Sequence, residues 1–143
     1  MRILIDADGC PVVNLAIRIA KGHDVLCFIL CDTFHFFERE GATTITVSKG
    51  PDSADFVIAN LVKTGDIVIT QDYGLAAMCL ARQAIPINQD GMIYTDENIG
   101  GLLMQRHISQ KIRRSGGRHS GLLKRTEAQN KAFKLALNKL FSQ

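Results

Sequence analysis

The sequence predicts an α/β fold of three layers, in which a mainly parallel sheet of about five strands is flanked by helices. Two observations lead to this prediction. Short apolar runs of strand length alternate with segments whose apolar residues recur at helical spacing. This alternation is typical of βαβ units with right-handed crossovers. The chain has 143 residues, which is enough for one domain with a sizeable core.

The elements follow in order along the chain. Strands are expected at 2–6, 24–30, 43–47, 66–70 and 84–87, and helices at 11–22, 53–65, 74–82, 95–106 and 126–141. Pro11 suits the first turn of the first helix, and Gly22 suits its end. Thr95 is a candidate cap of the fourth helix. Thr126 with Gln129 matches a capping box before the last helix, whose apolar stripe is expected to pack on the body.

Charge is distributed unevenly between the two ends of the chain. Residues 1–105 hold 7 Lys and Arg against 13 Asp and Glu, whereas residues 106–143 hold 10 against 1. This asymmetry favours an anionic partner.

Other classes are disfavoured. No apolar run approaches the roughly 18 residues that a membrane span requires, so we expect no membrane partner. The four cysteines form no CxxC pair, which disfavours a zinc site and fits reduced thiols in the cytoplasm.

Aspartates follow several of the apolar runs directly. Asp6 and Asp8 end ILIDAD, Asp72 follows DIVIT, and Asp90 follows AIPI at a weaker position, since NQDG is also a good turn. Carboxyl ends of parallel strands meet at one sheet edge, where ligands of α/β folds bind. Clustered carboxylates repel one another, and a hard divalent cation relieves that repulsion. The pattern predicts a Mg²⁺ or Mn²⁺ site.

Each acid also has a structural explanation. Asp8 can cap the following helix, and Asp6 can stabilise the turn. Asp55 lies in the first turn of an expected helix, where the helix dipole favours an acid. Asp72 is well placed to cap the helix after it. Capping explains each aspartate singly but not why successive strand ends each have one.

Three segments carry a family resemblance: the opening MRILIDADGCPV, the stretch GPDSADFVIANLVKTGDIVITQDYGLA, and the basic tract RRSGGR. They resemble the YaiI/YqxD family of bacterial proteins, which is grouped with PIN-like domains. The similarity covers nearly the whole chain. It implies a single PIN-like domain over 1–143, with an acidic α/β body (1–105) and a basic loop and C-terminal helix (106–143) packing on it.

The likeness to PIN nucleases implies a function. It assigns Asp6, Asp55 and Asp72 to one or two Mg²⁺ or Mn²⁺ ions, with Asp8 beside them. Such enzymes hydrolyse phosphodiesters of RNA or DNA with metal-activated water. A further acid in the middle of PIN domains is matched only loosely, by Glu38 or Glu40. The tail also departs from the family's GGP-type turn, since it has SGLLKR from residue 120.

Basic side chains are the expected contacts to nucleic-acid backbone, RNA ahead of DNA. The candidates are Lys49, Arg113, Arg114, Arg118, Lys124 and Arg125. A charge run is also often a solvated face. Aromatic residues are scarce nearby, which favours sequence-tolerant binding. Small PIN-like domains often pair, so a homodimer is compatible with the resemblance.

Two rival functions remain open. ILIDADG has the DxDG form of haloacid-dehalogenase-like phosphatases, in which Asp6 would be the nucleophile and Asp8 the general acid. Cys10 stands where that motif usually has Thr, and the chain is short for that fold. The other rival is a non-catalytic nucleic-acid-binding module that keeps a PIN-like shape.

Overall fold

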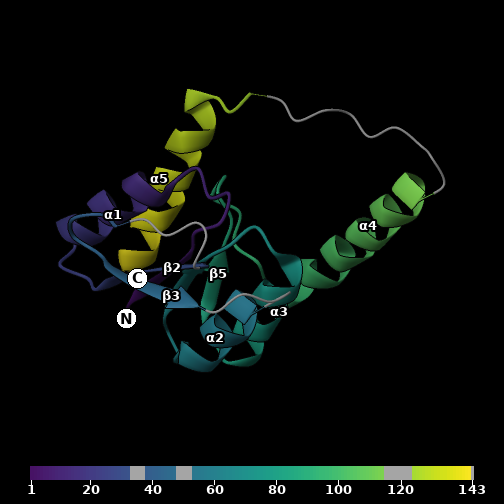
Figure 1. Cartoon of the computed structure of the whole chain (residues 1–143). Helices are drawn as coiled ribbons and strands as arrows, with labels where there is room; N and C mark the ends of the chain where they lie inside the picture. Colours follow the sequence, from purple (N-terminus) through teal and green to yellow (C-terminus); the bar gives the residue numbers. More distant parts are fainter. Residues whose placement is uncertain (33–37, 48–52, 115–123, 143) are drawn as a thin grey trace.

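A computed structural model of the chain describes residues 1–32, 38–47, 53–114 and 124–142, and within these ranges the side chains of 53–55 and 110–114 are not described. Its strands are β1 (Ile3–Asp6), β2 (Cys27–Asp32), β3 (Thr43–Val47), β4 (Ile67–Ile69) and β5 (Ile85–Ile87). Its helices are α1 (Val13–Gly22), α2 (Ser53–Leu61), α3 (Tyr73–Ala81), α4 (Asp96–Arg114) and α5 (Glu127–Phe141). Figure 1 shows the whole chain.

The five strands form one sheet in the order β3-β2-β1-β4-β5, and every pair is parallel. β1 lies at the centre, with Ile5 aligned to Ile29 of β2 and to Ile69 of β4. The predicted α/β class, with a parallel five-stranded sheet between helices, is confirmed. Within the described residues, none of the helices is long and apolar enough to span a membrane.

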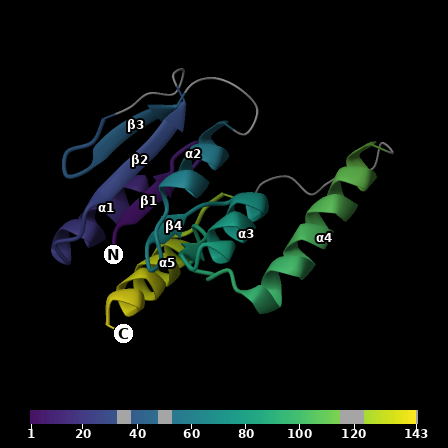
Figure 2. The ribbon, with the colours of Figure 1, turned by 90° about the horizontal axis from the view of Figure 1, so that it is seen from below.

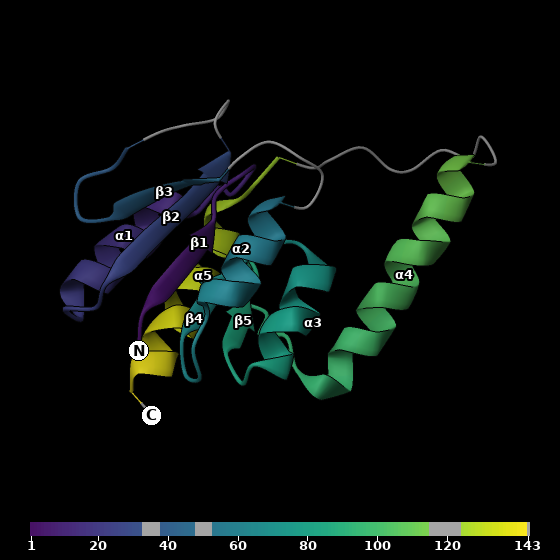
Figure 3. The ribbon, with the colours of Figure 1, turned by 60° about the horizontal axis from the view of Figure 1, so that its bottom comes forward.

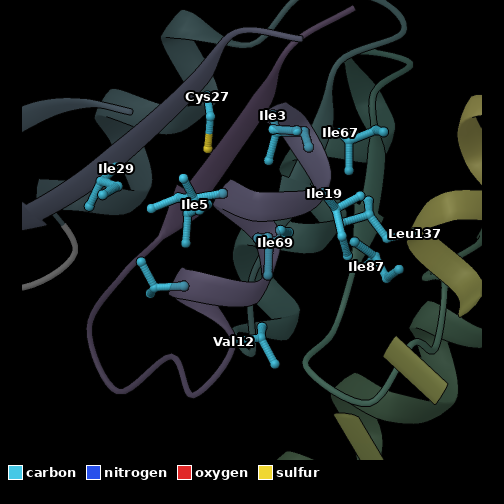
Figure 4. Packing of buried hydrophobic residues seen from close by; sticks show 14 of the residues in the cluster. Ile3, Ile5, Val12, Ile19, Cys27, Ile29, Ile67, Ile69, Ile87 and Leu137 are labelled. Carbon is cyan, nitrogen blue, oxygen red and sulfur yellow. The ribbon is translucent and has the colours of Figure 1, made fainter. Parts of the chain in front are cut away.

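Alternation along the central strands divides the core into two halves. Ile3 and Ile5 point to the face covered by α1 and α5, whereas Leu4 points to the face covered by α2 and α3. Figures 2 and 3 show these helix pairs on opposite sides of the sheet. Figure 4 shows Ile19 of α1 and Leu137 of α5 packing with the strand isoleucines. Both faces of the central strands β1 and β4 are therefore buried, as is typical of a parallel sheet, whereas the edge strand β3 stays partly exposed.

Helix α5 lies beside α1 and completes the helical layer on that face of the sheet. Its predicted capping box is present, with reciprocal bonds between Thr126 and Gln129. Gly91 (φ +87°) approaches its backbone so closely that a Cβ there would lie 2.6 Å from the Ala132 carbonyl oxygen. At the other end of α5, Phe141 stacks on His23 with ring centroids 4.4 Å apart. Between these contacts, α5 places Phe133, Leu137 and Leu140 in the core beneath α1 and the sheet.

Several predicted boundaries are wrong by a few residues. α1 begins at Val13, after Pro11, and its N-cap Val12 makes no side-chain cap bond. β2 runs to Asp32, because its pairing with β3 continues to that residue. α4 starts after Thr95, which exchanges hydrogen bonds with Asn98, and continues to Arg114. Residues 107–114 contain neither glycine nor proline, so nothing in the sequence stops the helix at Arg106.

All four cysteines are free thiols, and Cys27, Cys31 and Cys79 are buried. This agrees with the expectation of reduced, mostly buried cysteines.

A buried ion pair lies at the end of the sheet where β1 and β4 begin. Asp66 is 2% exposed and accepts hydrogen bonds from the Arg2 backbone, the Arg2 guanidinium and the Lys63 backbone. Burial alone would raise the pKa of Asp66, but these donors outweigh it and hold the pKa below its usual value. The pair fixes the start of both central strands.

Replacing Asp66 with Asn tests this anchor. At pH 7 we expect the free energy of unfolding to fall by about 2 to 3 kcal/mol, since Arg2 loses its charged partner. A lowered folded pKa stabilises the fold above the unfolded value of about 3.9, and this contribution is lost as pH falls further. The deficit of the variant in urea unfolding should therefore shrink below about pH 4.

Asp24→Asn is the matched control, because it removes a carboxylate from an exposed position. Equal effects of the two substitutions would contradict the role of the ion pair.

Candidate functional site

The candidate site lies at the carboxyl edge of the sheet, between β1 and β4. The chain places β2 and β3 on one side of β1 and then returns to place β4 and β5 on the other. The loops after β1 and β4 therefore diverge at the point where the strand order reverses. Ligands of open α/β sheets bind at such switch points. Asp6 ends β1, and Asp72 lies three residues beyond the end of β4.

The Thr70 hydroxyl links these two aspartates. It donates to Oδ2 of Asp6 at 2.8 Å and accepts from the backbone N–H of Asp72 at 3.0 Å. Thr70 is 1% exposed, and its carbonyl accepts from the buried Tyr94 hydroxyl at 3.1 Å. A buried, fully engaged threonine thus sets the relative position of Asp6 and the Asp72 backbone.

Asp72 is also the N-cap of α3. Its Oδ1 accepts from the backbone N–H groups of Gly74 at 2.8 Å and Leu75 at 3.1 Å. Arg106 of α4 brings Nη1 to 3.4 Å from the same oxygen, and the pair is partly exposed. The structural explanation of Asp72 as a cap is therefore correct, and within the described residues the contacts of this side chain all fall on one carboxylate oxygen, Oδ1.

The electrostatics of Asp6 are unfavourable to its charge. Burial raises the pKa of the Asp6 carboxyl to about 6, the Thr70 hydrogen bond lowers it, and the charges of Asp72 and Asp8 raise it again. Three carboxylates thus act on one another at this edge. Perturbed acids of this kind cluster at functional sites, although ion-pair networks also produce them.

The loop after β1 is held over the same edge. Gly9 has φ +69°, a left-handed conformation that favours glycine. Its carbonyl accepts from Nε2 of Gln71 at 2.9 Å, which joins the β1 loop to the β4 loop. Asp8 lies exposed on this loop. Cys10 follows it, and burial raises the pKa of the thiol to about 11.

The structure groups only some of the predicted acids. Asp6, Asp8 and Asp72 lie at one edge and interact electrostatically. Asp55 lies in the first turn of α2, as expected, but its side chain is outside the described residues. Glu38 and Glu40 are exposed before β3. Across the described parts of the chain, no group of three or more His, Cys, Asp or Glu residues is positioned to hold a metal ion.

The predicted basic residues have different surroundings. Lys49 and Arg118 lie outside the described residues, and Arg113 and Arg114 end α4 with side chains that are not described. Lys124 is exposed.

Arg125 makes specific contacts instead of pointing into solvent. Its guanidinium binds Asp90 at 2.8 Å, the Gln89 carbonyl and Asn130. Asp90, the weakest of the predicted strand-end acids, is thus a partner of Arg125.

Two polar residues of the site were missed from sequence. Thr70 was included only as part of an apolar strand, and Arg106 only as part of a helix. The TxD spacing is a usable signal for Thr70, since a hydroxyl two residues before a cap can bind the capping residue's N–H. Arg106 is 34 residues from Asp72, and no local pattern connects them.

Asp6→Asn tests whether the Asp6 charge destabilises the metal-free fold. A folded pKa of about 6 means that the fold binds the proton more tightly than the unfolded chain, so stability decreases as pH rises from about 4 to 6. At pH 7.5 in EDTA, Asp6→Asn should be more stable than the wild type by up to about 3 kcal/mol. At pH 4 we expect no such gain. Urea unfolding measures the stability difference between the two proteins at each pH.

The control is Asp96→Asn, which removes an exposed acid from the first turn of α4. A gain for Asp6→Asn that is the same at both pH values would contradict the shifted pKa.

Thr70→Val tests the bridging hydroxyl. The Thr70 hydrogen bond lowers the pKa of Asp6, so its removal should move that pKa above about 6. Carbon-detected NMR titration of the Asp6 carboxyl measures the change directly. An unchanged or lower pKa would show that the hydroxyl does not stabilise the ionised carboxylate.

The comparisons with known proteins agree with one another. The sequence profile of the YaiI/YqxD family, described as uncharacterised, matches residues 4–143. A UPF0178 protein of Exiguobacterium sibiricum is 52% identical over 143 residues, which cover 100% of this chain and 98% of the relative. One from Ruminiclostridium cellulolyticum is 47% identical over 96% of this chain and 90% of the relative.

A third relative, the UPF0178 protein of Natranaerobius thermophilus, is 43% identical over 100% of this chain and 97% of its own. No solved structure matches. With a family profile and relatives that span nearly the whole sequence, the resemblance found in the motifs is confirmed, and this chain belongs to the YaiI/YqxD family.

Proposed function

We propose that this protein is a metal-dependent nuclease that hydrolyses phosphodiesters of RNA, or of DNA, at the edge formed by Asp6 and Asp72. One observation carries the proposal. The fold holds Asp6 against Thr70, near Asp72 and Asp8, although burial and both neighbouring charges oppose its ionisation. Carboxylates kept together at such a cost are typical of functional sites, where a bound ligand offsets the repulsion.

The chemistry of the donors suits a hard divalent cation, even though the described side chains alone include no group of three positioned to hold one. Asp6, Asp72 and Asp8 supply carboxylate oxygens, which are the ligands that Mg²⁺ and Mn²⁺ prefer. Asp55 is the proposed fourth acid, since α2 packs against β1 and β2. When bound, Mg²⁺ or Mn²⁺ would polarise a phosphoryl oxygen and lower the pKa of a water molecule.

The protein's own residues would orient the reaction. Thr70 fixes one Asp6 oxygen, and the α3 backbone fixes one Asp72 oxygen, so neither carboxylate needs to reorganise when a substrate arrives. Arg106 lies beside Asp72 and is half exposed, so its guanidinium is available to a phosphate at the same edge. The chain thereby combines an acidic centre with a nearby fixed cation.

Charge supports a nucleic-acid substrate. α4 begins with Asp96 and Glu97 and ends in Arg113 and Arg114, and Lys124 is exposed before α5. We propose that this basic end, with Lys49 and Arg118, contacts phosphate backbone.

The first experiment is calorimetric titration of Mn²⁺ and Mg²⁺ into the metal-free protein. We expect binding by the wild type and by Asp96→Asn, and its loss in Asp6→Asn and Asp72→Asn. Asn remains a good N-cap, so Asp72→Asn should keep α3 intact. A labelled single-stranded RNA should be cleaved with Mn²⁺ by the first two proteins only, and all four should still bind it. Absence of metal binding by the folded wild type, with and without RNA, would contradict the proposal.

The two rival functions predict different results with the same variants. A phosphatase that uses Asp6 as nucleophile would accumulate an acid-stable phospho-aspartate, trapped by rapid quenching, which metal-activated water would not produce. A binding module would hold RNA equally well with and without metal and cleave none of it.

A further inference from the structure

A groove separates α1 and α5 on the face opposite α2 and α3. It encloses about 590 Å³, and its apolar base includes Leu15 and Ile19 of α1. Figure 1 shows the two helices side by side. Their contact is closed at one end, where His23 binds Asn138 at 2.8 Å and stacks on Phe141. The rest of the groove is open along the helices.

The rim of this groove is basic. Arg18 lies on α1, and Lys131 and Lys134 are three residues apart on α5, which places both on one side of the helix. The only acid along the rim of the described groove is Glu127. Arg18, Lys131 and Lys134 are exposed, and none of them forms an ion pair within the described residues. Three available cations around an apolar floor fit a polyanion.

The two helices that form the groove both begin on the side of the candidate site. Asn130 lines the groove and accepts from Nε of Arg125 at 2.7 Å, and Arg125 in turn binds Asp90 beside the sheet edge. α1 begins at Val13, a few residues after Asp8 on the loop that follows β1. The open end of the groove therefore lies next to the loops that carry the carboxylates. From Glu127 to Asn138 the helix rises on the order of 16 Å, which is long enough for several nucleotides.

We propose that the α1–α5 groove binds the sugar–phosphate backbone of a single nucleic-acid strand that reaches the Asp6–Asp72 edge. Arg18, Lys131 and Lys134 contact phosphates, and Leu15 with Ile19 contact sugars. Binding is sequence-tolerant, since the groove offers no exposed aromatic side chain for base stacking apart from the His23 ring, which is stacked on Phe141. This inference rests on the proposed function for the identity of the anion, but its cations are separate from the carboxylates.

The test uses the full chain in EDTA and a fluorescein-labelled 12-nucleotide single-stranded RNA, with binding followed by anisotropy. Lys131→Glu/Lys134→Glu should weaken binding by at least 10-fold. The matched control is Lys21→Glu/Lys139→Glu, which makes the same total charge change with one lysine on α1 and one on α5, neither of which lines the groove. We expect the control to weaken binding by less than 3-fold. Equal losses in both double variants, or no loss in the first, would overturn the proposal.

Alanine substitutions remove the same two charges without reversing them, so they are less disruptive to the fold than the glutamate substitutions. Lys131→Ala/Lys134→Ala should reduce the slope of log affinity against log salt by about 1.4, because each single-strand phosphate contact contributes about 0.7. An unchanged slope would overturn the proposal. So would tighter binding of a poly-glutamate peptide than of RNA, since the groove would then be an acidic-peptide site.

Metal titration of the same variants separates this inference from the nuclease proposal. If the groove variants lose RNA but retain Mn²⁺ binding, both proposals stand. If RNA binds through the groove but no metal binds at Asp6 and Asp72, the nuclease proposal fails and the groove remains a nucleic-acid site. If metal binds and causes cleavage while the groove variants bind RNA normally, only the groove inference fails.

Discussion

Parallel pairing of the strands around β1 is the constraint on which the rest of the structure depends. Because β1 is central and buried on both faces, Ile3, Leu4 and Ile5 must all be apolar, and helices must cover each side. Polar groups are then confined to the two ends of the strand. The same pairing brings the ends of β1 and β4 together, so that Asp6 meets Thr70 across the switch point.

The acids at the two ends of these strands have opposite electrostatic surroundings. Asp66 receives a guanidinium and several N–H donors, which stabilise its charge. Asp6 receives one hydroxyl and the repulsion of two carboxylates. The charge of Asp66, at the start of β4, is thus neutralised, whereas the charge of Asp6, at the end of β1, is not balanced by a nearby cation among the described residues. Stability given up at a functional edge and recovered elsewhere is a common arrangement in proteins.

Local patterns predicted most of the elements and the strand-end positions of Asp6, Asp8 and Asp72, because strand period, capping residues and strand-end aspartates are short-range signals. The capping box at Thr126 and the cap at Thr95 are examples. Contacts between distant parts of the chain left no such signal. Arg106 with Asp72, Arg125 with Asp90, and the groove between α1 and α5 all depend on how whole helices pack. The side chain of Asp55 is not described, so its membership of the site stays a prediction.

The contacts of Arg106 and Arg125 have a consequence for the sheet edge that they neutralise. Arg106 binds Asp72 and Arg125 binds Asp90, so the two arginines that flank residues 107–124 in the sequence each have an acidic partner near the same sheet edge. Both ion pairs are partly exposed, so dissolved salt screens them. At high ionic strength Asp72 and Asp90 would lose much of this neutralisation, whereas the buried Asp66 at the other end of the strands is screened less. The charge balance of the carboxyl edge therefore depends on the ionic strength of the solution.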